Sequence, residues 1–296
     1  MEGENLLKEL YRKKEKLKLP NYIIGFTQYE EETDFSPIWK VITYTPSSGT
    51  WKNAFQKLIL HINSTHNLNL KDYKSNKPTI FVEGTTDLHY LNHSLDIFFS
   101  SFKGKFDILS QKSAGANWVA NQLAIWAIAK KKYNKGGYIP AVGLLDSDIA
   151  GNDAKSKLKK RIQTDNENNC FKILQINQGF SKELIEFYKN GLKIEIEIES
   201  LFPIDILKYA DDKGWLEHRA SSFIVPPPAW NQFEQNSKDY ILSRGIDKEK
   251  LVILKKVKRE HKEDFCKYVL NCQNQKEVFK NFKAILKDLL EMLSLK

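Results

Sequence analysis

Two pairs of acidic residues stand where a strand-forming sequence gives way to a polar one. Glu83 and Asp87 follow the sequence TIFV, and Asp146 and Asp148 follow the sequence AVGLL. Carboxylate oxygens are the ligands that hard divalent cations such as Mg²⁺ prefer in proteins. A bound divalent cation can activate water and stabilise negative charge on a leaving oxygen. The four acids are therefore candidates for metal-dependent chemistry, provided that the fold brings them together.

The segments around these acids alternate between expected strands and expected helices. The sequence predicts strands at residues 79–82, 105–110, 138–146 and 171–176, and helices at residues 85–99 and 114–133. Strands that alternate with helices indicate a parallel sheet with helices on both faces. The third strand is mostly apolar, which is typical of a central position. The expected fold class is therefore α/β.

Such a sheet would place the acids at one edge, because functional groups gather at the carboxyl ends of parallel strands. Residues two apart in an extended chain point to the same side, so Asp146 and Asp148 can aim at one point. Asp87 lies one helical turn after Glu83 and can reach the same edge. If the first and third strands are neighbours, four carboxylates converge. Mg²⁺ or Mn²⁺ would then offset their mutual repulsion.

Each acidic motif has a simpler alternative explanation when it is taken alone. An Asp-x-Asp sequence before a glycine is common in turns, and by itself it is more often a loop than a metal site. The sequence VEG at residues 82–84 is a weaker signal still. Both motifs end expected strands within one alternating unit, and this combination favours a metal site.

The two motifs together resemble a known family. The sequences FVEGTTD and GLLDSD are similar to those of the Toprim domain, which topoisomerases, bacterial primases and several nucleases share. The family places an acid at the end of its first strand and an Asp-x-Asp at the end of its third, and Glu83, Asp146 and Asp148 match that pattern. The resemblance covers residues 77–178 and extends more loosely to residue 205. It implies a Toprim-like parallel sheet flanked by helices.

Within this family, the chain is most similar to nucleases of the OLD (overcoming lysogenization defect) type, which also carry the acid at Asp87. The sequence KSAGANWV stands where these nucleases have a glycine-rich turn, with Gly115 as its one glycine. The sequence IESLFP resembles their later acidic motif and implies Glu199 as an additional metal ligand, with Glu197 as the alternative. The sequence HKEDFCKYV resembles their lysine motif and implies that Lys262 stabilises charge on the scissile phosphate.

The resemblance implies a metal-dependent endonuclease that uses Mg²⁺ or Mn²⁺ and cuts DNA, with RNA as the alternative substrate. Nucleases of the OLD type normally carry an ABC-type ATPase in the same chain, and this sequence contains no G-x-x-x-x-G-K-[ST] motif. We therefore expect a stand-alone Toprim nuclease that works with a separate ABC-type ATPase in bacterial anti-phage defence. The alternatives are a non-catalytic Toprim module that binds nucleic acid or a partner, and a primase-like nucleotidyl transferase.

The sequence predicts three regions. Residues 1–76 are expected to form an α+β region, with two short strands between two helices, that contacts a partner or a second copy in a homodimer. Residues 77–205 are expected to form the Toprim catalytic domain, and residues 206–296 a helical region that carries Lys262. The alternating sequence KIEIEIES predicts an edge strand with one wet face. The last forty or so residues predict two amphipathic helices.

Composition limits the class of protein. The chain has 296 residues with 46 Lys and Arg against 37 Asp and Glu, a net charge of +9 that suits a nucleic acid partner or, alternatively, a solvated lysine-rich surface. No apolar run reaches the eighteen residues or so of a membrane span, and we expect no membrane contact. The sequence starts without the apolar core of a secretion signal, and scattered cysteines suggest free thiols in a cytoplasmic protein. These cysteines are Cys170, Cys266 and Cys272.

Overall fold

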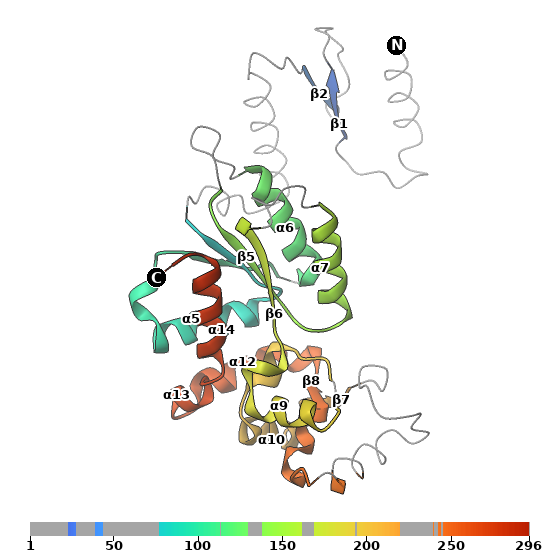
Figure 1. Ribbon diagram of the computed structural model, residues 1–296, viewed down its shortest axis with the longest axis vertical. Helices are drawn as coiled ribbons and strands as arrows, with labels where there is room; N and C mark the ends of the chain where they lie inside the picture. The colour runs from blue at the N-terminus through green and yellow to red at the C-terminus, as the bar shows by residue number, and fades with distance from the viewer. Residues whose placement is uncertain are drawn as a thin grey trace. The chain divides into compact units, whose positions relative to one another are not determined.

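The computed structural model divides the chain into two compact units, Met1–Asp72 and Tyr73–Lys296. It describes residues 23–27, 39–43, 77–112, 114–129, 138–161, 169–192, 194–219, 239, 242–243 and 245–295. In the first unit, strands β1 (Ile23–Thr27) and β2 (Trp39–Thr43) form a parallel pair within the two stretches that were expected to be short strands (Figure 1). The two helices and the partner contact predicted for residues 1–76 lie outside the described residues.

The second unit is built around a parallel sheet of four strands in the order β4-β3-β5-β6. The strands are β3 (Thr79–Phe81), β4 (Asp107–Leu109), β5 (Ala141–Leu145) and β6 (Phe171–Gln175). Strand β3 pairs directly with β5, with Thr79 opposite Ala141. The prediction of an α/β fold is confirmed, and the condition for bringing the acids together, that the first and third strands are neighbours, is met.

Helices cover both faces of this sheet because the side chains of its strands alternate between two cores. Ile80 and Val142 belong to the core under helices α5 and α14, and Phe81 and Leu145 belong to the core under helices α6 and α7. The bounds are α5 (Thr85–Phe98), α6 (Gly115–Ala129), α7 (Ile149–Arg161) and α14 (Phe282–Met292). Figure 1 shows α6 and α7 together on one side of the strands, opposite α5 and α14.

A glycine in the middle of β5 allows α6 to pack closely on the sheet. A Cβ atom at Gly143 would lie 2.6 Å from Cγ1 of Val119 and 2.9 Å from Cδ1 of Leu123, both on α6. Distances below about 3.0 Å are too short for carbon atoms in contact, so any larger residue would force the helix side chains to move. This packing holds the start of α6 beside the carboxyl end of β3.

The two amphipathic helices predicted near the C-terminus are confirmed in part, because two longer helices form there but a strand and a very short helix form in the same segment. The C-terminal part of the second unit contains β7 (Leu216–His218) paired with β8 (Lys255–Val257), followed by helices α12 (Lys262–Asn271), α13 (Gln275–Val278) and α14. Val252, Ile253 and Leu254 are all buried, and three consecutive buried positions do not fit one helix face. The chain leaves α12 through Asn274, whose φ of 54° lies in the left-handed region and separates α12 from α13.

One aromatic core joins the sheet to the C-terminal helices. The ring of Phe202 lies 5.1 Å from that of Tyr90 on α5, 5.4 Å from that of Phe265 on α12 and 5.0 Å from that of Phe282 on α14. These residues are all nearly inaccessible to solvent. Residues on either side of position 205 therefore share a core, and a domain boundary at 205 stays a prediction.

Two further expectations concern the cysteines and the possibility of a membrane-spanning helix. The three cysteines are free thiols, as predicted. Among the described residues, no helix combines the length and the apolar character that crossing a bilayer requires.

Candidate functional site

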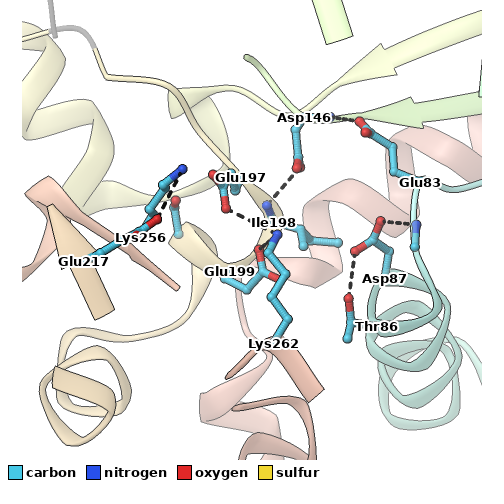
Figure 2. Close-up of polar contacts among 12 residues, drawn as sticks. Glu83, Thr86, Asp87, Asp146, Glu197, Ile198, Glu199, Glu217, Lys256 and Lys262 are labelled. Carbon is cyan, nitrogen blue, oxygen red and sulfur yellow. Dashed lines mark hydrogen bonds and ion pairs between the residues drawn. The ribbon is translucent and has the colours of Figure 1, made fainter. Parts of the chain in front are cut away.

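The acids that follow β3 and β5 lie side by side. The Glu83 side chain reaches across to the loop after β5, where its Oε1 accepts a hydrogen bond of 2.8 Å from the main-chain amide of Asp146 (Figure 2). The carbonyl oxygen of Glu83 accepts a second bond, of 3.0 Å, from the amide of Gly115. Gly115 has a φ of +68°, which glycine adopts readily, so the one glycine of the expected turn connects the start of α6 to this edge.

Asp87 lies on the first turn of α5 and helps to begin that helix. Its Oδ2 accepts a hydrogen bond of 3.0 Å from the amide of Gly84, and its Oδ1 is 3.4 Å from the hydroxyl of Thr86. A carboxylate at this position satisfies a free helix amide and is favoured by the helix dipole. Asp87 therefore has a structural role of its own, and in Figure 2 its carboxylate also faces the space between Glu83 and Lys262.

Asp146 and Asp148 bind different partners. Oδ1 of Asp146 accepts a hydrogen bond of 3.0 Å from the amide of Ile198, in a segment that is remote in sequence. Oδ1 of Asp148 accepts a bond of 2.6 Å from the amide of Gly151, in the first turn of α7. Asp148 thus serves as a cap for α7, whereas Asp146 connects β5 to the residues that precede α10 (Ile204–Asp212).

The segment 194–199 was expected to be an edge strand, and this prediction was wrong. Only Ile196 pairs with the loop after β5, through an isolated bridge to Ser147, and a short 3₁₀ helix begins at Ile198. Ile196, Ile198 and Glu199 are all buried, so the alternating sequence does not create one wet face and one dry face. Glu195 accepts a hydrogen bond of 3.1 Å from the amide of Ile149, which fixes this segment against the start of α7.

Lys262 is the cation at the centre of the site. Its Nζ lies 3.2 Å from Oε2 of Glu199 and 3.3 Å from Oε2 of Glu197 (Figure 2). The Glu199 side chain is 2% exposed and that of Glu197 is 12% exposed, whereas that of Lys262 is 31% exposed. The sequence left open whether Glu197 or Glu199 is the functional acid. In the structure, the carboxylates of both residues contact the ammonium group of Lys262.

Burial dominates the electrostatics of the acids. Burial raises the pKa of Glu83 from 4.5 to about 7, helped by the charges of Asp87 and Asp148 and opposed by the amide of Asp146. Burial likewise raises the pKa of Asp87 from 3.8 to about 7, helped by the charge of Glu199 and opposed by Lys262. Burial and the charge of Glu83 raise the pKa of Asp146 well above its ordinary value. The site therefore favours additional positive charge.

Arg219 is a second cation near these acids, and the sequence analysis missed it. It follows β7, is 4% exposed, and donates a hydrogen bond of 2.7 Å from Nη2 to the hydroxyl of Ser200. Its Nε and Nη1 atoms are buried without a hydrogen-bond partner. Burial lowers its pKa, while the charges of Glu197 and Glu195 act in the opposite direction. No motif surrounds Arg219, so the only signal is its position in space.

The chemistry of the acids suits the divalent cation that the resemblance implies. The implied ligands are all carboxylates, namely Glu83, Asp87, Asp146, Asp148 and Glu199. One of their oxygens, Oε1 of Glu199, is buried without a hydrogen-bond partner and lies beside Lys262. Within the described ranges, no three His, Cys, Asp or Glu side chains are grouped closely enough to hold a metal ion. Lys262 and main-chain amides contact the acids instead, so a cation would have to replace some of these contacts.

Comparisons of the chain with protein-family models, curated proteins and solved structures found no match. The class of the protein is therefore described from its fold and its site alone. The second unit is an α/β protein whose parallel sheet carries buried carboxylates and a lysine at its carboxyl edge.

Proposed function

We propose that this chain is a Toprim-type nuclease that hydrolyses phosphodiester bonds in DNA, with RNA as the alternative substrate, using Mg²⁺ or Mn²⁺. The observation that carries the proposal is the hydrogen bond of 2.8 Å between the Glu83 carboxylate and the amide of Asp146. It places an acid from the end of β3 beside an acid from the end of the neighbouring strand β5. These two positions agree with the pattern of acids that the family resemblance implies.

The residues of the site divide into two groups by charge. The acids Glu83, Asp146 and Glu199, with Asp87 and Asp148 beside them, would hold the cation. When bound, a divalent cation supplies an activated water and neutralises charge on the phosphodiester. Lys262 would donate hydrogen bonds to phosphate oxygens, because its ammonium group is the one that lies among these acids.

The exposed lysines of helix α7 favour the proposal that the substrate is a polyanion. Beginning directly after Asp148, the helix carries the exposed side chains of Lys157, Lys159 and Lys160. Lysines at such a position can neutralise phosphates of a nucleic acid that runs past the site. The net charge of +9 acts in the same direction.

The biological setting belongs to the same proposal. We infer that the chain acts in the cytoplasm as an effector of anti-phage defence and depends on a separate ABC-type ATPase. The support is the resemblance to OLD-type nucleases, which normally work with such an ATPase. Co-expression with an ATPase encoded beside the gene, followed by co-purification, tests this dependence.

The test of the activity uses purified protein with supercoiled plasmid and with single-stranded and double-stranded DNA and RNA, in Mg²⁺, Mn²⁺ or EDTA. We expect cleavage that EDTA abolishes and that Glu83→Gln or Asp146→Asn lowers by about 100-fold or more. Both substitutions keep the oxygen that accepts the observed hydrogen bond, so the fold should persist. Asp96→Asn is the matched control, because Asp96 is half exposed and pairs with Lys103 away from the acids.

Three results would contradict the proposal. Cleavage at the wild-type rate by folded Glu83→Gln or Asp146→Asn protein would show that these acids take no part in the reaction. Binding of nucleic acid without cleavage, with the ATPase and cations present, would favour the non-catalytic module. Incorporation of nucleotides into a primer would instead favour the nucleotidyl transferase.

A further inference from the structure

We propose that Lys262 is an internal counter-ion that a divalent cation displaces, and that the displaced ammonium group then binds the substrate phosphate. This inference rests on the proposed function and concerns how the same site is regulated. It makes the binding of the cation and of the nucleic acid cooperative, with a single side chain as the link between them.

The first support is the position of the ammonium group. Nζ of Lys262 lies between the carboxylates of Glu197 and Glu199, at 3.3 and 3.2 Å. In Figure 2, the lysine side chain extends from the start of α12 toward the same space that the Asp87 carboxylate faces.

The second support is that the contact is loose enough to exchange. Charge-assisted hydrogen bonds from an ammonium group to a carboxylate are usually about 2.7–2.9 Å long. Both contacts of Lys262 exceed that range, which indicates that one ammonium group is shared between two carboxylates. The lysine has a flexible stem of four carbon atoms, and its side chain is 31% exposed. It can therefore move toward solvent without a change in the backbone of α12.

The third support is that the two cations exclude each other. Mg²⁺ binds carboxylate oxygens at about 2.0–2.1 Å, a distance that leaves little room for an ammonium group on the same oxygen. Two positive charges in a poorly solvated site also repel each other strongly. A cation on Oε2 of Glu199 therefore requires that Lys262 leave it, and a cation on the unpartnered Oε1 would be repelled by the ammonium group on the other oxygen.

The displaced lysine then needs new acceptors. Its ammonium group has three hydrogen-bond donors and no acceptor of its own. A phosphate oxygen beside the bound cation offers a charged acceptor within reach of the moved side chain. Nucleic acid would thus stabilise the arrangement in which the cation is bound, and the cation would stabilise the arrangement that binds nucleic acid. Thermodynamic linkage makes the two effects equal.

The experiment measures Mn²⁺ binding to the full chain by calorimetry at about pH 8, without nucleic acid. Lys262→Met keeps the length and apolar character of the side chain but removes the charge. We expect it to bind Mn²⁺ roughly tenfold more tightly than the wild type, because nothing has to be displaced. Lys267→Met is the matched control, since Lys267 is an exposed lysine on the same helix, and its affinity should equal that of the wild type.

The second measurement tests the link itself. A phosphorothioate oligonucleotide that resists cleavage is titrated with and without Mn²⁺, and its binding is followed by fluorescence anisotropy. Mn²⁺ should tighten binding to the wild type and to Lys267→Met, and should have little effect beyond charge screening on Lys262→Met. Should Lys262→Met unfold, the Lys262→Met/Glu197→Gln double variant, which restores the local net charge, is compared with Glu197→Gln.

The outcomes separate this inference from the proposed function. Equal or weaker Mn²⁺ binding by the folded lysine variant would overturn the inference, whereas EDTA-sensitive cleavage by the wild type would leave the proposed function standing. If neither the wild type nor the variant binds Mn²⁺ or cuts nucleic acid, the inference and the proposed function fail together.

Discussion

The amide of Asp146 donates a hydrogen bond of 2.8 Å to the carboxylate of Glu83, which joins the loops after two adjacent parallel strands. Glu83 therefore holds the main chain of Asp146 in place. The side chain of Asp146 is expected to share a cation with Glu83. An alanine at position 83 would remove this bond along with the charge. Glutamine is the more informative substitution, because it removes the charge alone.

The raised pKa values of Glu83 and Asp87 predict how the stability of the metal-free protein depends on pH. Both values are about 7 in the folded protein, above the ordinary values of 4.5 and 3.8. A carboxyl group whose pKa is raised by folding binds its proton more tightly in the folded state. Its contribution is complete below the ordinary pKa and is lost as the pH rises through about 7.

We therefore expect the free energy of unfolding in EDTA to fall between pH 5 and pH 8, by on the order of 1 kcal/mol for each group. Denaturant titrations at several pH values measure it. Glu83→Gln and Asp87→Asn should each flatten the profile, and Asp96→Asn should not. A wild-type profile that rises over this range would contradict the electrostatic account of the site.

Gly151 predicts a steric test of the loop that carries Asp146 and Asp148. A Cβ atom at position 151 would lie 2.2 Å from the carbonyl oxygen of Asp146, which is main chain and cannot rotate away. Gly151→Ala should lower the free energy of unfolding by about 1–3 kcal/mol and reduce cleavage, because the loop has to shift. The measurements are a denaturant titration and the plasmid assay.

Gly84→Ala is the matched control for that substitution. Its nearest new contact is 3.7 Å, and its backbone is extended, so the free energy of unfolding should change by less than about 1 kcal/mol. An equal loss of stability in the two variants would show that the contact with Asp146 is not what makes glycine necessary at position 151.

Much of the sheet could be predicted from the sequence because its signals are local. Apolar strand sequences, the helical period of α6 and the acids at the strand ends all lie within short windows. The pairing of β3 with β5 then placed Glu83 beside Asp146, as the prediction required. The same local signals did not show that Asp148 would cap α7 instead of sharing a partner with Asp146.

The contacts that depend on remote segments could not be predicted in the same way. Alternation in the sequence IEIEIES suggests a wet face only if its glutamates meet water. Glu199 is instead buried against Lys262, 63 residues further along the chain, and nothing nearby in the sequence indicates that partner. Arg219 could not be predicted for the same reason. Its partner Ser200 and the glutamates that interact with it are close to it in the folded protein but not in the sequence.

Arg219 predicts a stability effect that differs between two substitutions. Arg219→Met removes a buried positive charge that interacts with Glu195 and Glu197 and should lower the free energy of unfolding by about 2–4 kcal/mol. Arg219→Lys keeps a charge and should lose less. Thermal and denaturant unfolding at neutral pH measure both, with Lys267→Met as the exposed control. Equal losses in the two Arg219 variants would mean that shape rather than charge makes arginine necessary there.

The shared aromatic core predicts that the sheet cannot fold without the C-terminal helices. A chain that ends at residue 205 loses Phe265 and Phe282, which pack on the ring of Phe202. We expect this truncated chain to show no cooperative unfolding transition, whereas the full chain shows one. In the full chain, Phe202→Ala should lower the free energy of unfolding by about 3–5 kcal/mol. A truncated chain with a sharp melting transition would support an independent domain at residues 77–205.

The position of Lys262 on α12, far along the chain from Glu83, has a consequence for synthesis. Translation produces Glu83, Asp146 and Glu199 before it produces the ammonium group that contacts Glu197 and Glu199. A nascent chain therefore carries all of these acids before it carries the lysine that contacts Glu197 and Glu199. Under the proposed function, no cutting of nucleic acid begins while the enzyme is still being made.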